Sequence, residues 1–133
     1  MAGGGVTALA VSGSNVYAGG WFETAGGSPA NDIAKWDGAN WSALGSGFSV
    51  AVDALVVRGS HVYVGSVNMG YIGEWDGVEW SGLGSGVDHG VNALAISGSN
   101  LYVGGSFGTA GGKFSPCVAK ANLPSGPEIT VQD

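Results

Sequence analysis

Basic residues are scarce in this chain of 133 residues. It has four of them, Lys35, Arg58, Lys113 and Lys120, against ten acidic residues, which gives a formal net charge of −6. A surface of this charge repels phosphate backbones, so we expect no nucleic-acid partner. An anionic membrane is a poor partner for the same reason. Because the sequence also lacks an apolar run of 18 residues, we expect no membrane insertion.

Cysteine and the motifs of common enzymes are also nearly absent. The single cysteine, Cys117, can form no internal disulfide and has no companions for a metal site. We therefore expect it to be a small buried apolar residue. The sequence contains no nucleophile elbow, no Walker-type phosphate loop and no HExxH motif. These absences predict a protein that is not an enzyme and that holds no cofactor and no metal.

What the chain does contain is a sequence repeat that occurs three times. VTALAVSGSNVYAGG at 6–20 returns as VDALVVRGSHVYVGS at 52–66 and as VNALAISGSNLYVGG at 91–105, with offsets of 46 and 39 residues. DIAKWDGANWSALGSG at 32–47 matches YIGEWDGVEWSGLGSG at 71–86, and PCVAKANLP at 116–124 matches in part. Periods of this size indicate a solenoid, a propeller or an array.

Each repeat is predicted to form four short strands, and no helical period is present. The Gly-Ser pairs give tight turns between the first two strands, and Asp37-Gly38 and Asp76-Gly77 give turns between the last two. The strands are apolar on both faces, so both faces must be covered, as they are when the blades of a β-propeller stack. We expect a single all-β domain over 1–133, with antiparallel blades at about 6–47, 52–86 and 91–133.

The C-terminal segment EITVQ at 128–132 alternates apolar and polar residues like a strand. The third repeat lacks a counterpart of WSALG, so this segment is expected to supply its outer strand, in the same chain or swapped between chains. A second interpretation makes GPEITVQD the first strand of an immunoglobulin-like module.

The order of an apolar strand, Tyr-x-Gly-Gly, a variable loop, Trp-Asp-Gly and Trp resembles the kelch-like propeller repeats of bacterial secreted or surface proteins. The resemblance covers residues 6 to about 124. It implies an extracellular or cell-surface location, although the beginning MAGGG is not expected to be a signal peptide. The second repeat departs from the pattern at Ser66, and the third departs from it at Ala121-Asn122.

Three blades do not close a ring, because propellers have four to eight. We therefore expect two chains to pair head to tail as a homodimer with six blades. The predicted function is a structural or protein-interaction module completed by self-association. Two alternatives stay open: a carbohydrate-binding propeller, and a fragment of a larger enzyme or surface protein.

The loops of variable length between the second and third strands, with the links between repeats, are the expected place for a glycan or protein ligand. The candidates there are Trp21, Glu23, Asn68, Tyr71, Asp88, His89 and Lys113.

Other conspicuous residues are assigned to the scaffold. Trp36, Trp41, Trp75 and Trp80 are expected to be cross-strand packing pairs. Asp37 and Asp76 are expected to stabilise turns, and His61 to lie on the surface in a turn.

Overall fold

Strands make up all the regular secondary structure in the part of the chain that the structure, a computed structural model, describes. This part comprises residues 4–48, 50–67, 69–82, 87–114, 117–123 and 130–132. No helix occurs within these ranges, and none that could cross a membrane is found there. The prediction of an all-β chain built from several antiparallel sheets is confirmed.

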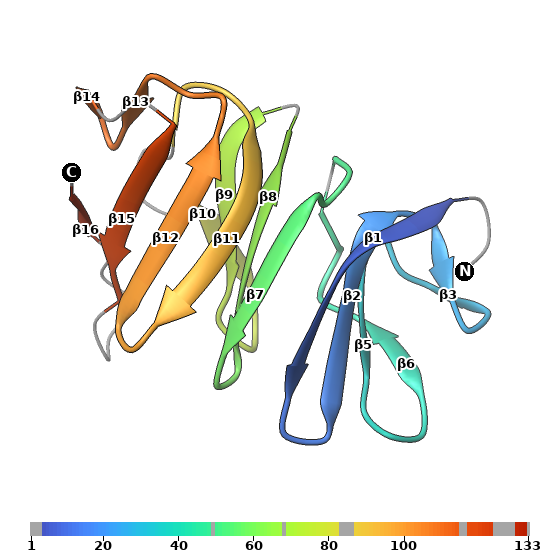
Figure 1. Cartoon of the computed structure of the whole chain (residues 1–133). Coiled ribbons are helices and arrows are strands. Elements are labelled where there is room, and N and C mark those ends of the chain that lie inside the picture. Colours follow the sequence, from blue (N-terminus) through green and yellow to red (C-terminus); the bar gives the residue numbers. More distant parts are fainter. Residues whose placement is uncertain are drawn as a thin grey trace.

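Three sheets of four strands follow one another along the sequence, each an antiparallel meander (Figure 1). Sheet 1 contains β1 (Gly5–Ser12), β2 (Asn15–Trp21), β5 (Ile33–Trp36) and β6 (Trp41–Ala43). Sheet 2 contains β7 (Ala54–Arg58), β8 (His61–Ser66), β9 (Met69–Trp75) and β10 (Trp80–Gly82). Sheet 3 contains β11 (Val91–Ser97), β12 (Asn100–Gly105), β15 (Val118–Asn122) and β16 (Thr130–Gln132). The fourth strand of sheet 3, β16, pairs with β15 of the same chain.

The turns within the sheets have the chemistry that the sequence predicts. Each pair of first and second strands is joined by a Gly-Ser turn, in which Gly13, Gly59 and Gly98 take φ angles of 61°, 63° and 61°. The turns between third and fourth strands are held by a carboxylate. Asp37 Oδ1 accepts the backbone N–H groups of Ala39 and Asn40 at 2.9 and 2.7 Å. Asp76 does the same in sheet 2, and these hydrogen bonds lower the pKa of both carboxyl groups.

The sheets pack face to face in the order 1, 2, 3, with β7 in contact with β1 on one side and β11 on the other. Leu55 and Val57 of β7 point toward sheet 1 and join a core with Tyr17 and Ile33. Ala54 and Val56, at alternate positions of the same strand, join the core with sheet 3. Sheet 2 is therefore covered on both faces, which explains why its strands are apolar at successive positions.

Tryptophan pairs pack across neighbouring strands, as predicted. Trp36 pairs with Trp41, and Trp75 with Trp80, each at a ring-centroid distance of 5.5 Å. The indole N–H of Trp80 donates to the carbonyl of Leu44 at 2.8 Å, which fixes sheet 2 to the link that leaves sheet 1.

A polar cluster lies between sheets 2 and 3. Burial raises the pKa of Tyr63 to about 12, and the carboxylate of the nearby Glu74 adds to the rise. His61 flanks the Gly59-Ser60 turn with a side chain that is 39% exposed, as predicted, but its Nδ1 also lies 3.4 Å from Glu74 Oε2. Arg58 closes the cluster by donating from Nη1 to the Leu123 carbonyl of sheet 3 at 3.0 Å.

The expectation that Cys117 is buried is wrong, since its side chain is exposed. Cys117 takes a φ of 67° just before β15, and Asp32 takes a φ of 62° at the equivalent place before β5. The backbone N–H of Cys117 donates to the carbonyl of Phe107, and the carbonyl of Cys117 accepts the N–H of Gly105. The backbone is thus held by the fold while the thiol faces solvent.

Leu55→Ala should lower the free energy of unfolding by about 2–5 kcal/mol, because Leu55 is buried between two sheets and its removal leaves a cavity. Val78→Ala is the control, since Val78 is an apolar residue on an exposed turn. Chemical unfolding of both variants checks this expectation. Equal stability of the two would contradict an internal position for β7.

Candidate functional site

The long loops of sheets 1 and 3 fold into small hairpins. One consists of β3 (Thr24–Ala25) and β4 (Ser28–Pro29), and the other of β13 (Thr109–Ala110) and β14 (Lys113–Phe114). Both turn through a Gly-Gly pair with positive φ, Gly26-Gly27 and Gly111-Gly112. The corresponding loop of sheet 2 is shorter, so each hairpin is an addition to a common scaffold.

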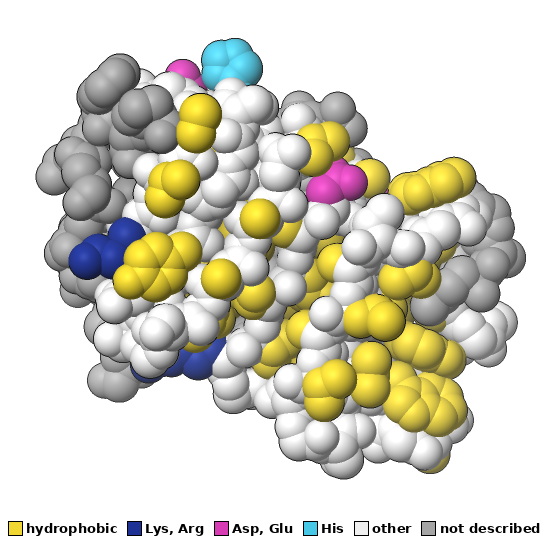
Figure 2. Space-filling view, viewed as in Figure 1, with side chains coloured by type: hydrophobic (Ala, Val, Ile, Leu, Met, Phe, Trp, Pro, Cys, Tyr) yellow, Lys and Arg dark blue, Asp and Glu magenta, His cyan; other side chains and the backbone are white. Residues whose placement is uncertain are grey.

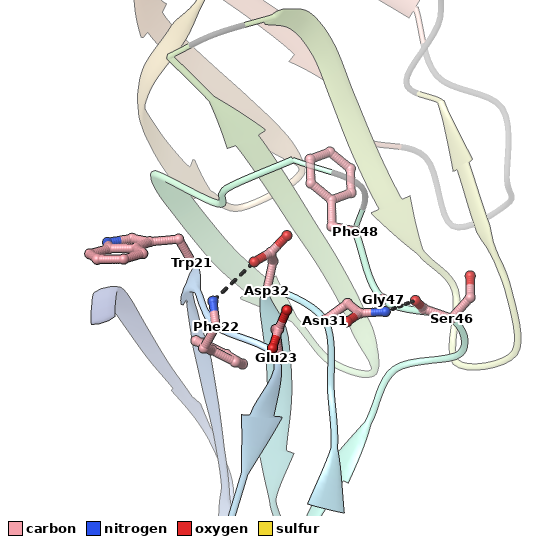
Figure 3. Close-up of a pocket in the computed structure, with 8 residues that line it drawn as sticks. All are labelled: Trp21, Phe22, Glu23, Asn31, Asp32, Ser46, Gly47 and Phe48. Carbon is pink, nitrogen blue, oxygen red and sulfur yellow. Dashed lines mark hydrogen bonds between the residues drawn. The ribbon is translucent and has the colours of Figure 1, made fainter. Parts of the chain in front are cut away.

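A cavity of about 490 Å³ opens beside the first hairpin (Figure 3). It is lined by the end of β2, the residues before β5 and the link from sheet 1 to sheet 2: Trp21, Phe22, Glu23, Asn31, Asp32, Ser46, Gly47 and Phe48. The Trp21 side chain is 56% exposed, so its ring offers an apolar surface to a ligand. The described residues that line the cavity include two carboxylates and no basic side chain, which disfavours an anionic ligand.

The polar groups of the cavity are held in place by the backbone. Asp32 Oδ1 accepts the N–H of Phe22 at 3.1 Å, and Asn31 Nδ2 donates to the carbonyl of Ser46 at 3.3 Å. Burial raises the pKa of Asp32, and the Glu23 carboxylate raises it further, while the hydrogen bond from Phe22 opposes the rise. This arrangement can bind hydroxyl or amide groups beside an aromatic ring.

Of the candidate residues whose side chains the structure describes, Trp21 and Glu23 line the cavity, and Asp88 and His89 do not. Asp88 and His89 lie on the link to sheet 3, with His89 Nδ1 at 3.5 Å from Asp88 Oδ2. Asn68 lies outside the described residues. Tyr71 lies in β9 and Lys113 in β14, and for these two the structure describes the backbone alone.

Sequence reasoning missed Asn31, Asp32 and Phe48 as partners of Trp21. They come from segments up to 27 positions from Trp21 along the chain, and only the packing of the link against sheet 1 brings them together. The Asn-Asp pair at the end of a glycine-rich loop was the available signal, because these residues tolerate the positive φ that Asp32 adopts.

The outer faces of the first and last sheets form a second candidate site. We call the face of sheet 1 that is turned away from sheet 2 the head face; it carries Val6, Leu9, Val11, Val16 and Trp36. Leu9 is 66% exposed, and Figure 2 shows hydrophobic side chains gathered over β1 and β2. A cavity of about 190 Å³ is lined there by Val16, Trp36 and Trp41.

The face of sheet 3 that is turned away from sheet 2, here called the tail face, is also apolar. It carries Ala93, Ala95, Tyr102, Gly104 and Val118, with Lys120 beside Tyr102. Tyr102 is 39% exposed, whereas its counterpart in sheet 1, Tyr17, is 4% exposed. Both outer faces therefore expose large apolar side chains to solvent.

Within the described ranges, no group of three or more His, Cys, Asp or Glu side chains could hold a metal ion.

No protein-family model matches the chain, and no curated protein is significantly similar to it. Two solved structures of computationally designed proteins share its fold. The Ika8 protein has a TM-score of 0.64 at 24% identity, over 92% of this chain and 35% of the Ika8 chain. The Ika4 protein has a TM-score of 0.60 at 20% identity, over 98% of this chain and 91% of the Ika4 chain. These likenesses show a shared fold and give no support to the kelch-like resemblance. The chain spans about a third of the length of Ika8.

Asp88→Asn should destabilise the protein at neutral pH, because Asp88 Oδ1 accepts the N–H groups of Gly108 and Thr109 at 2.8 and 3.0 Å. These hydrogen bonds lower the pKa of Asp88 in the folded state. The stabilisation is therefore present above the unfolded pKa, about 3.9, and is lost as pH falls through the folded value. We expect the difference in melting temperature between native protein and variant to shrink in acid. A difference that grows below pH 4 would contradict this role.

Proposed function

We propose that the chain is a non-enzymatic structural module that completes a β-propeller by self-association, head face to tail face. The observation that carries the proposal is that the residues of the two internal interfaces recur on the two open faces. At equivalent positions of the repeat, the head face carries the kinds of residue that sheet 2 uses to contact sheet 1. The tail face carries the kinds of residue that sheet 2 uses to contact sheet 3. A second copy would therefore meet each open face with the partner residues of an interface already present twice in the chain.

The exposures of equivalent residues support this pairing. Leu9 is 66% exposed on the head face, while Leu55 at the same position of sheet 2 is 7% exposed. Tyr102 is exposed on the tail face, while Tyr17 and Tyr63 are buried. The small cavity at Trp36 and Trp41 lies where the link bearing Phe48 covers Trp75 and Trp80 in the next repeat. The residues on each open face are thus exposed at positions that a neighbouring repeat covers elsewhere in the chain.

Two chains of three blades give a closed ring of six, which lies within the usual range of four to eight. A ring with a twofold axis leaves no open face, and closed cyclic dimers are the commonest homo-oligomers. The resemblance of the repeats to kelch-like propellers fits this account as part of the proposal. The likeness to Ika8 adds that a unit of this fold can be one part of a longer chain.

Two variants test the polarity of the association. Leu9→Lys blocks the head face and Tyr102→Lys blocks the tail face, both by placing a charge at a position that assembly would bury. Each variant alone lacks one half of the interface, so each should elute as a monomer of 13.1 kDa on a sizing column. Mixed together, they retain one intact head face and one intact tail face and should form a dimer.

Circular dichroism of each variant confirms that it is folded, since both positions are on exposed surface. A mixture that stays monomeric, while the native chain self-associates, would contradict head-to-tail pairing. Self-association of either variant alone would contradict it as well.

A second candidate function, binding of a neutral carbohydrate, is favoured by the cavity at Trp21. Its exposed indole ring offers an apolar platform for the face of a sugar ring. Glu23, Asn31 and Asp32 offer hydrogen-bonding groups to hydroxyls on the same cavity wall.

Trp21→Ala should weaken binding of the best neutral oligosaccharide on a glycan array by about tenfold or more, because stacking area is lost. Isothermal titration with that oligosaccharide measures the change. Trp36→Ala is the matched control, since Trp36 lies on the head face and not in the cavity. No binding by the native protein, or equal binding by Trp21→Ala, would rule out this function.

A further inference from the structure

A valine sits on a glycine of the neighbouring sheet at each internal interface. A Cβ atom added to Gly19 would lie 2.5 Å from Cγ1 of Val52, and one added to Gly65 would lie 2.5 Å from Cγ1 of Val91. Carbon atoms do not approach so closely, so any larger residue must displace the valine. Val52 and Val91 are both fully buried by this contact. The glycine is thus a notch, and the valine fills it.

In the third repeat no valine of the described residues fills the notch, and the equivalent valine of the first repeat packs on no glycine notch. Gly104 is the equivalent of Gly19 and Gly65, but among the described residues a Cβ atom added to it would meet only Cβ of Ala93 and the carbonyl oxygen of Cys117, each at 3.9 Å. Val6 is the equivalent of Val52 and Val91, and it is 42% exposed. Gly104 lies on the tail face and Val6 on the head face, so the two belong to opposite ends of the chain.

We infer that Val6 of one copy packs into the Gly104 notch of the next copy and thereby sets the register of the assembly. This inference rests on the proposed head-to-tail association and specifies its contact. The notch fixes how the two faces align along the strands, because the next position on the same face of β12 is Tyr102, whose side chain would clash with the valine.

A hydrogen bond between turns supports the same register. Ser12 Oγ donates to the carbonyl of Gly59, from the turn of sheet 1 to the turn of sheet 2, at 3.1 Å. Ser97 is the equivalent of Ser12 in sheet 3, and it is exposed. Gly13 of sheet 1 is the equivalent of Gly59. With Val6 in the notch, Ser97 of one copy faces the Gly13 carbonyl of the next.

Gly104→Ala is the decisive variant, because it fills the notch with a single methyl group. Among the described residues no atom lies closer than 3.9 Å to the added methyl group, and the φ of Gly104 is outside the left-handed region, so the monomer should fold with an unchanged melting temperature. Sedimentation velocity across a range of concentrations should show a dissociation constant for self-association that is larger than that of the native chain by about tenfold or more.

Two glycine-to-alanine variants serve as controls. Gly108→Ala adds a methyl group at an open position away from the tail face, and it should leave both melting and association unchanged. Gly65→Ala fills an internal notch and should lower the melting temperature of the chain itself. If the native chain associates and Gly104→Ala associates equally well, the register is wrong while the proposed association stands. If the native chain stays monomeric at every concentration, the proposed association itself is wrong.

Discussion

The contact between a valine and a glycine on the next sheet is the constraint on which the rest of the structure depends. Val52 on Gly19 and Val91 on Gly65 let the sheets approach closely near the ends of their first strands. Close approach brings Leu55 and Tyr63 into buried layers and places the links against the tryptophan pairs. The stability of the chain comes from these layers, since each sheet of four short strands has little core of its own.

The same contact has an unmatched half on each outer face: Val6 is exposed on the head face, and Gly104 holds no valine of the described residues on the tail face. A repeat buries its faces only against neighbours, and a terminal repeat ordinarily carries a polar outer face. Here the terminal faces retain Leu9, Val11 and Tyr102 instead. In the proposed assembly, these faces would be covered by the matching faces of a second copy.

The sequence was sufficient to predict the four strands of each sheet, because the triple repeat aligns Val6, Val52 and Val91 and turn residues separate the strands of each unit. It did not predict the small hairpins β3–β4 and β13–β14, which it treated as loops. It was not sufficient for features that depend on packing between segments. The cavity at Trp21 needs Phe48 from a later link, and His61 meets Glu74 only through the pairing of β8 with β9. Cys117 is exposed and takes a positive φ, and its residue type signalled neither property.

The absolute mass of the native chain in solution tests the central claim most directly. Light scattering behind a sizing column, repeated over a range of concentrations, gives that mass without assumptions about shape. The account predicts a discrete species of twice 13.1 kDa that dissociates on dilution. A monomer that persists at the highest concentration would contradict it, because both apolar faces would then be stable in water.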